Sequence, residues 1–292
     1  MAETDMGSGT GAGLAAPGSS TRERILDLLR EEPRNGWKSG EVLSSLLGIS
    51  RAAVAKHVAV LREAGHVIEA VPRRGYRLVA EADSYSESAV RELLQTRVLG
   101  QESWTWLDET TSTNSVAALQ ALEGAREGSI VVARSQSSGR GRKGHQWISL
   151  PRSLAFSLIL RPRTDSGGLE LLTGFVLQAA VEAIESVCGL QAVIKQPNDI
   201  LLAGRKVGGL LVETGFRAAD LEWAVFGLGI NVNARSGDIP EDLRDKATSL
   251  YNETGRPVGR AGLLREILER FERLYLGAQD IFDTRAAEQK SG

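Results

Sequence analysis

The sequence predicts an α+β protein in which a small helical module precedes a larger domain built on a mixed sheet. Its 292 residues suffice for about two domains with sizeable cores. Up to about residue 80 the chain shows three closely spaced helical patterns, whereas the remainder alternates strand patterns with a few helices. Apolar residues make up 42% and charged residues 25%, values typical of a globular rather than a disordered chain.

Composition excludes several classes of function. The single cysteine, Cys188, excludes an internal disulfide and most cysteine-based metal cages, and the three histidines are scattered. We therefore expect no metal held by protein ligands alone. No uninterrupted apolar run of about 18 residues is present, and residues 1–20 lack the basic and apolar stretches of a secretory signal. We therefore expect a cytoplasmic protein with no membrane partner.

Charge is distributed unevenly along the chain. Residues 1–19 are rich in Gly, Ala and Ser, and we expect them to form a disordered tail. Residues 20–80 carry 11 Lys/Arg against 7 Asp/Glu, whereas residues 81–292 carry 24 against 28. The overall net charge of -2 therefore combines a basic front module with a mildly acidic main body. A basic module of this size suggests a polyanionic partner.

The front module is expected to hold three helices and a hairpin. The first helix begins at Ser20 and ends before Pro33, the second runs from Ser39 to Gly48, and the third starts at Ser50 and ends at Gly65. A short link with a glycine between two brief helices is typical of a helix-turn-helix. Two β-rich pieces follow at 67–71 and 76–79, joined by a turn with two arginines, so the pattern predicts a winged helix. The alternative is a small three-helix interaction module with a solvated basic face.

The outer face of the third helix offers small side chains and cations. Small side chains let a helix approach the floor of a DNA groove, and cations contact phosphates and base edges. The order of three helices and a basic wing favours DNA binding over the interaction module. The predicted DNA contacts are Ser50, Arg51, Ala52, Lys56, Arg73 and Arg74.

The main body is predicted to contain six strands and three helices. In the strand at 154–161 both faces are apolar, which indicates burial on both sides. We expect a sheet with helices on one side. The strands are predicted at 104–107, 129–135, 154–161, 192–195, 206–214 and 223–232, and the helices at 115–122, 169–187 and 259–282.

A glycine–arginine loop at 139–144 is the first of four segments that indicate chemistry. Alternating glycines let the backbone curve around a ligand with its amides exposed, and the arginines add positive charge. No Gly-Lys-Ser/Thr follows at the spacing of a Walker motif. The loop therefore indicates an anion cradle, with a mobile basic loop or an RNA-binding arginine–glycine segment as the alternatives.

The other three segments are weaker signals. At 195–199 a lysine beside a proline turn is suited to a carboxylate or phosphate, although an ordinary turn has the same composition. At 112–114 three short polar residues precede a helix, where capping is the better supported use and a polar ligand the other. Glycines within the strands at 206–213 and 227–233 indicate the close approach of a ligand, or else a packing need or a bulge. No Ser-His-Asp or Cys-His nucleophile set is evident.

Taken in order, these segments resemble the biotin protein ligase family, and more closely its bifunctional members, the biotin operon repressors. The resemblance covers residues 20 to about 282. It implies a winged helix-turn-helix at 20–80 and, at 81–292, a mixed-sheet ligase domain similar to the catalytic domains of class II aminoacyl-tRNA synthetases. Segments that carry it are 39–58, 139–147, 195–199, 206–213 and 227–231.

The resemblance implies a reaction in two steps. The carboxylate of biotin attacks the α-phosphate of ATP to give biotinyl-5′-AMP and pyrophosphate. A lysine of the biotin carboxyl carrier protein of acetyl-CoA carboxylase then takes the biotinyl group. Both nucleophiles come from substrates, so the enzyme supplies positioning and positive charge. Mg²⁺ is expected to arrive with ATP.

Site residues follow from the resemblance position by position. Biotin and its adenylate would be bound by Ser112, Thr113, Asn114, Gln136, Arg140, Gly141, Arg142 and Lys195. Lys195 and Arg142 would act in catalysis, Lys195 by neutralising the reacting oxygens and Arg142 by retaining the adenylate. Further ATP contacts would come from Asn198, Asp199, Lys206 and Asn231.

The resemblance also implies repression by a dimer, and the sequence departs from the family pattern at three places. The adenylate-bound form would dimerise and bind a two-fold operator. Gln196 stands where the family motif usually has tryptophan, His145 and Gln146 stand where more basic residues are common, and the small C-terminal β-barrel domain of relatives is expected to be absent after Phe282. Two alternatives remain: a transcription regulator that senses biotin or its adenylate with little ligase activity, and a lipoyl ligase.

Overall fold

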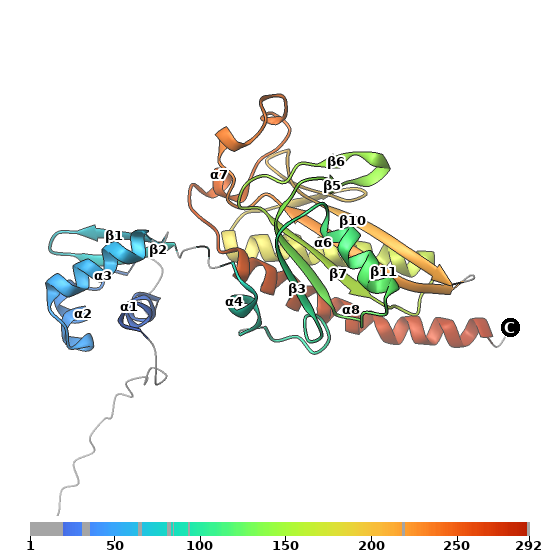
Figure 1. The fold of residues 1–292 in the computed structure, drawn as a ribbon, viewed down its shortest axis with the longest axis horizontal. Helices are drawn as coiled ribbons and strands as arrows, with labels where there is room; N and C mark the ends of the chain where they lie inside the picture. The colour runs from blue at the N-terminus through green and yellow to red at the C-terminus, as the bar shows by residue number, and fades with distance from the viewer. Residues whose placement is uncertain are drawn as a thin grey trace, which may run out of the picture. The chain divides into compact units, whose positions relative to one another are not determined.

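The computed structural model describes residues 20–30, 36–63, 66–80, 83, 85–92, 94–217 and 220–290. The chain divides into two compact units, residues 1–82 and 83–292. Figure 1 shows the helical N-terminal unit and the larger unit built around a sheet. The predicted disordered tail, residues 1–19, lies outside the described residues.

The N-terminal unit consists of α1 (Thr21–Arg30), α2 (Gly40–Leu47), α3 (Arg51–Glu63) and a hairpin of β1 (Val67–Val71) and β2 (Gly75–Ala80). Two of the three predicted helix starts have a capping bond: the Ser39 hydroxyl accepts a hydrogen bond from the Val42 amide at 3.1 Å, and the Ser50 hydroxyl accepts one from the Ala53 amide at 3.1 Å. Helix α2 ends at Gly48, whose φ of 67° suits glycine. The predicted helix-turn-helix with its wing is confirmed.

A separate small core holds this unit together. Its buried side chains come from all three helices and from β1. The wing is fastened to the segment before α2, because Lys38 and Tyr76 exchange two backbone hydrogen bonds of 2.9 Å. Gly75 is required there, since a Cβ at this position would lie 2.2 Å from the Lys38 carbonyl oxygen. The buried set is Ile25, Leu26, Leu29, Leu43, Leu47, Val54, Val58, Leu61 and Ile68.

The larger unit is built on a seven-stranded sheet in the order β3, β4, β7, β11, β10, β9, β8. Strands β3 and β4 are parallel and every other neighbouring pair is antiparallel, so the predicted mixed sheet is confirmed. The strands are β3 (Trp104–Thr110), β4 (Ile130–Gln136), β7 (Leu154–Leu160), β8 (Val193–Lys195), β9 (Asp199–Leu202), β10 (Arg205–Arg217) and β11 (Asp220–Ile230). A two-stranded hairpin of β5 (Gly139–Arg140) and β6 (Gln146–Trp147) stands apart from the sheet (Figure 1).

Helices cover both faces of this sheet. Helices α6 (Ser166–Cys188) and α8 (Arg260–Lys290) pack against the face that contains Leu158 and Phe226. Helix α5 (Thr113–Leu122) packs on the opposite face through Ala117 and Ala121 (Figure 1). The expectation that helices lie on one side only was therefore wrong, because two small alanines let α5 approach the other face closely. Short helices α4 (Glu87–Arg91) and α7 (Leu250–Thr254) complete the unit together with 3-10 turns at Arg142–Gly144, Ser236–Asp238 and Glu241–Leu243.

The central strands and α6 account for most of the apolar sequence. All seven residues of β7 are buried, as the two-sided apolar pattern predicted. Helix α6 is long and apolar enough to cross a membrane by length and composition. Its buried side chains, among them Leu172, Val176 and Ile184, belong to the core shared with the sheet and α8, so that core explains its apolar character.

Candidate functional site

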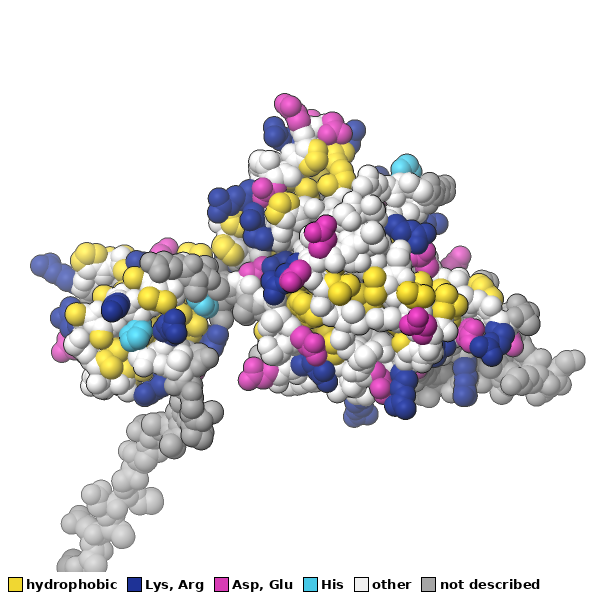
Figure 2. Space-filling view, viewed as in Figure 1, with side chains coloured by type: hydrophobic (Ala, Val, Ile, Leu, Met, Phe, Trp, Pro, Cys, Tyr) yellow, Lys and Arg dark blue, Asp and Glu magenta, His cyan; other side chains and the backbone are white. Residues whose placement is uncertain are grey.

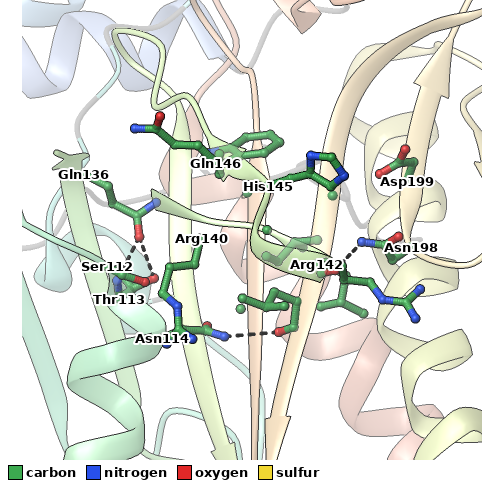
Figure 3. A pocket seen from close by; sticks show the side chains of 18 of the residues that line it. Ser112, Thr113, Asn114, Gln136, Arg140, Arg142, His145, Gln146, Asn198 and Asp199 are labelled. Carbon is green, nitrogen blue, oxygen red and sulfur yellow. Dashed lines mark hydrogen bonds between the residues drawn. The ribbon is translucent and has the colours of Figure 1, made fainter. Parts of the chain in front are cut away.

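A cavity of about 220 Å³ lies on the α5 side of the sheet; we call it the first cavity. Its walls come from the start of α5, the end of β4, the β5–β6 hairpin, the β8–β9 turn and the middle of β10 and β11. Ten predicted site residues line it (Figure 3): Ser112, Thr113, Asn114, Gln136, Arg140, Gly141, Arg142, Asn198, Asp199 and Lys206.

The polar end of the first cavity is formed at the start of α5. The Gln136 side-chain oxygen accepts hydrogen bonds from the Thr113 amide at 2.8 Å and from its hydroxyl at 3.2 Å (Figure 3). Ser112 occupies the N-cap position, but its hydroxyl makes no capping bond and has no other partner among the described residues. Capping, which the residues alone favoured, is therefore wrong for Ser112. Its side chain, in a residue only 3% exposed, is left to bind a ligand in the cavity.

Asn114 is held by groups that the sequence did not indicate. Its amide nitrogen donates to Glu213 Oε2 at 3.0 Å, and its oxygen lies 2.6 Å from the buried Ser157 hydroxyl. Gly227 makes room for it, since a Cβ there would lie 1.8 Å from Asn114 Oδ1. Ser157 was the only polar residue within the apolar run of β7, which is the signal that could have found it.

The glycine–arginine loop forms the β5–β6 hairpin over the first cavity. Arg140 forms an ion pair of 2.8 Å with Glu213, the same carboxylate that holds Asn114. Arg142 forms none of the side-chain hydrogen bonds or ion pairs found among the described residues, and in Figure 3 its guanidinium lies on the Asn198 side, away from Ser112. Arg142 also lines a second cavity, of about 530 Å³, next to α6. The two arginines of the loop therefore differ, because Arg140 is fixed by an ion pair and Arg142 is free of one among the described residues.

The opposite wall is organised by Asp199 and Lys206. Their side chains form an ion pair of 2.6 Å, and the Lys206 ammonium lies 5.8 Å from the centre of the Trp147 ring. Trp147 packs over Gly229, where a Cβ would come within 2.7 Å of its ring. A flat aromatic ring, a lysine and a carboxylate side by side suit a nucleoside phosphate.

Two predicted residues do not line the first cavity. Lys195 ends β8 with an exposed side chain, although its Cα pairs with that of Asp199 across the turn that contains the cis Gln196–Pro197 bond. Asn231 lies just beyond β11, and it is buried. Its amide nitrogen donates to the Thr248 carbonyl at 3.0 Å, while its Oδ1 has no partner within the described part of the chain.

The single cysteine takes no part in this site. Burial raises the pKa of the Cys188 thiol from 9.0 to about 11, so the thiol is protonated at neutral pH and is a poor nucleophile. Within the described residues, no group of three His, Cys, Asp or Glu side chains is arranged to hold a metal ion.

The predicted DNA contacts lie on one face of the N-terminal unit. Arg51, Ala52 and Arg73 line a groove of about 590 Å³ between α3, the start of α2 and the hairpin. Ser50 and Lys56 are exposed but lie outside its lining. Arg74, in the turn of the wing, lies over the Trp37 ring at 5.0 Å, which holds its guanidinium against the segment before α2. Lys and Arg side chains are spread over the visible face of this unit (Figure 2).

Comparison with known proteins gives matches for both units. The profile of the biotin/lipoate A/B protein ligase family matches residues 106–231, and that of an HTH domain matches residues 21–77. The bifunctional ligase/repressor BirA of Bacillus subtilis is 40% identical over 258 residues, which are 88% of this chain and 79% of that protein. The Escherichia coli protein of the same name is 32% identical over 81% of this chain and 74% of its own.

A solved structure also resembles the larger part of the chain. The biotin protein ligase of Aquifex aeolicus, in complex with biotin and ATP, superimposes with a TM-score of 0.53 at 32% identity. The match covers 61% of this chain and 72% of that one.

Proposed function

This chain belongs to the biotin/lipoate A/B protein ligase family, and from that membership we propose that it is an ATP-dependent biotin protein ligase and a DNA-binding repressor. The observation that carries the proposal is the first cavity itself. It joins an unpartnered serine hydroxyl, a cationic glycine loop and an aromatic–lysine wall, and among its described lining residues there is no cysteine and no serine hydrogen-bonded to a histidine. This combination suits a reaction in which both nucleophiles come from substrates.

We propose that biotin binds at the start of α5. The Ser112 hydroxyl would bond the ureido ring, and the pair Thr113–Gln136 would fix that end of the cavity. Gly227 and Gly229 would leave room for the valeryl chain along β11. Biotin would then direct its carboxylate toward the loop, where Arg140 and Arg142 lie.

Adenylate formation is then a matter of positioning and charge. A carboxylate oxygen of biotin attacks the α-phosphorus of ATP, and the bond to the β-phosphate breaks with release of pyrophosphate. Arg140 and Lys206 are already paired with carboxylates. Arg142 and Lys195 form no ion pair among the described residues, which leaves them to stabilise the charge that develops on the phosphate. The exposed Lys195 would turn its long side chain toward the ligand.

ATP would lie along the Trp147 wall. Asn198, Asp199 and Lys206 would contact the nucleotide from the β8–β9 turn and β10, and Asn231 would shape the end of β11. Asp199 is the one carboxylate among the described lining residues, and Lys206 already pairs with it. We therefore propose that Mg²⁺ enters as the counterion of ATP.

Membership of this family also suggests the partners of the protein and its location in the cell. We propose that the acceptor is a lysine of the biotin carboxyl carrier protein of acetyl-CoA carboxylase, since relatives carry the name biotin–[acetyl-CoA-carboxylase] ligase. The N-terminal unit would bind operator DNA through its groove and wing. A homodimer formed on ligand binding would match a two-fold operator. The protein would act in the cytoplasm.

The test mixes the protein with biotin, MgATP and a carrier domain and weighs the carrier by mass spectrometry. We expect an increase equal to one biotinyl group that disappears when ATP is omitted. An unmodified carrier, with biotin binding confirmed by calorimetry, would contradict ligase activity. It would instead favour a regulator that senses biotin or its adenylate.

Lipoyl ligation remains a second candidate because the matching family includes lipoate ligases. Thermal melting with each vitamin separates the two, since a ligand that binds only the folded state raises the melting temperature. We expect biotin and not lipoate to raise it.

A further inference from the structure

The second cavity has no role in the function proposed so far. It lies between α6, the β8–β9 turn and β10, and it adjoins the first cavity because Arg142, Asn198 and Leu210 line both. A molecule in the second cavity therefore reaches the same arginine and asparagine that border the first. Arg142, which the proposed function places at the phosphate of the adenylate, borders both cavities.

Its described lining combines apolar walls with one carboxylate and with the Arg142 guanidinium, which it shares with the first cavity. Leu177, Val212 and Pro197 supply apolar surface, and Glu170 supplies the carboxylate. Glu170 is exposed and forms no ion pair within the described residues, whereas Glu182 on the same helix bonds Gln178 and Arg270. The proposed function assigns the Arg142 guanidinium to the phosphate of the adenylate, which leaves the Glu170 carboxylate to attract a second cation.

A lysine side chain has the matching chemistry. Its methylene groups suit the apolar walls, and its ammonium group suits a partly exposed carboxylate. We propose that the second cavity admits the acceptor lysine of the carrier protein and that Glu170 binds its ammonium group during approach. This inference rests on the proposed ligase function and extends it to the site of the second substrate.

The transfer step balances without a further reactant. The lysine ammonium first loses one proton to solvent, and the neutral amine then attacks the carbonyl carbon of biotinyl-AMP. The new N–C bond forms as the C–O bond to the phosphate breaks, AMP leaves with the electron pair, and the second amine proton passes to solvent. Glu170 binds the lysine before attack, and it therefore affects the transfer and not the adenylation.

The first test replaces Glu170 with Gln, and the matched control is Glu185→Gln. Glu185 is also exposed on α6 but does not line the cavity. Adenylate is formed first from biotin and MgATP, and transfer is then started with either a carrier domain or hydroxylamine, a small nucleophile that is neutral at pH 7. We expect E170Q to raise the KM for the carrier about twofold to fivefold, the size of one exposed ion pair. The kcat, the rate with hydroxylamine and the amount of adenylate should match those of the control.

The second test fills the second cavity with a larger side chain at Gly174 on α6. Gly174 lines it, and a Cβ at this position would meet nothing within 4 Å, so alanine fits there and improves helix propensity, whereas leucine extends further into the cavity. We expect Gly174→Leu to slow carrier biotinylation about tenfold or more and to retain adenylate formation. A leucine that blocks the binding of the acceptor lysine would lower the affinity for the carrier by about a factor of ten, or 1.4 kcal/mol. Gly174→Ala should behave as wild type. Thermal melting checks that both variants fold.

The following outcomes would contradict the proposal that the second cavity admits the acceptor lysine. Equal carrier kinetics for E170Q and the Glu185 control would exclude Glu170, and normal transfer by a folded Gly174→Leu variant would exclude the cavity. Equal slowing of hydroxylamine and carrier by E170Q would place Glu170 at the adenylate. If the wild-type protein forms no adenylate, the ligase function itself is contradicted. This result can be told apart from a failure of the second-cavity proposal, in which adenylate still forms.

Discussion

At the scale of single residues, the site is divided between groups that are already bonded and groups that are left free. Arg140 and Lys206 have carboxylate partners, and Asn114 is bonded to Glu213. Ser112 and Arg142, in contrast, have no side-chain partner among the described residues. Free polar groups beside a cavity gain most from a ligand, because a bound ligand satisfies them without breaking an existing bond.

Ser112→Ala should weaken biotin binding and leave the fold unchanged. One hydrogen bond contributes about 0.5–1.5 kcal/mol, so we expect a loss of roughly threefold to tenfold in affinity by calorimetry. Ser157→Ala is the contrasting variant: its hydroxyl contacts Thr113 and Asn114 at 2.8 and 2.6 Å, so it should lower the melting temperature as well. Unchanged affinity in Ser112→Ala would remove this serine from the biotin site.

Lys195→Ala should largely abolish adenylate formation. Removal of one group that stabilises transition-state charge costs about 100-fold or more in rate, which pyrophosphate release would measure. The side chain is exposed, so the melting temperature should stay that of wild type. Val193→Ala, on an exposed position of the same strand, is the matched control. Normal pyrophosphate release by the lysine variant would contradict the role of Lys195.

Arg142→Gly should release the adenylate before transfer. With this cation removed, the loop keeps Arg140 near the phosphate, and that guanidinium is already paired with Glu213. We expect biotinyl-AMP in the filtrate and biotin on lysines of a bystander protein such as albumin. Retained carrier selectivity would count against the assignment.

At the scale of elements, glycines in β11 decide how closely side chains approach the sheet. Gly227 accommodates Asn114 and Gly229 accommodates Trp147, so the strand presents bare backbone to the first cavity. The same strand pairs with β7 and β10 on its two sides, which fixes the position of both glycines. The glycine pattern in the sequence thus indicated a close approach, and the groups that approach in the structure are the side chains of Asn114 and Trp147.

Gly227→Ala should displace Asn114, since the added Cβ would lie 1.8 Å from its Oδ1. Overpacking of this kind costs about 1–3 kcal/mol in the free energy of unfolding, and biotin affinity should fall with it. Gly237→Ala is the control, because a Cβ there would meet nothing within 4 Å. Chemical denaturation and calorimetry measure the two effects. A stable Gly227→Ala protein with normal biotin affinity would contradict this account of the strand.

At the scale of the whole molecule, the two units have separate hydrophobic cores. The core of the N-terminal unit contains only residues from 25 to 68, and the main core of the larger unit begins at Tyr85. Within the larger unit Asp83 forms a buried ion pair with Arg260, which ties the beginning of that unit to α8. Each unit therefore has the contacts that it needs to fold by itself.

Removal of residues 20–80, together with the tail before them, should abolish binding to promoter DNA of biotin genes and leave adenylate formation intact. Fluorescence anisotropy of labelled DNA measures the first effect and pyrophosphate release the second. The larger unit contains every residue that lines the first cavity, which is why the ligase reaction should persist. Retained DNA binding by the shortened chain would refute the role of the winged helix.

Local signals in the sequence predicted the helix-turn-helix, the wing and a main domain built on a sheet, whereas the resemblance to the ligase family supplied the ten predicted residues that line the first cavity. Caps such as Ser39, two-sided apolar runs such as β7 and the glycine–arginine loop act over a few residues, so they are visible without a structure. Only the tertiary structure decided that α5 covers the second face of the sheet and that Glu213 joins Arg140 to Asn114. It also decided that Lys195 lies outside the cavity and that a second cavity opens beside α6. These features depend on contacts between segments about 20 to 100 residues apart, and neither local propensity nor spacing encodes such contacts.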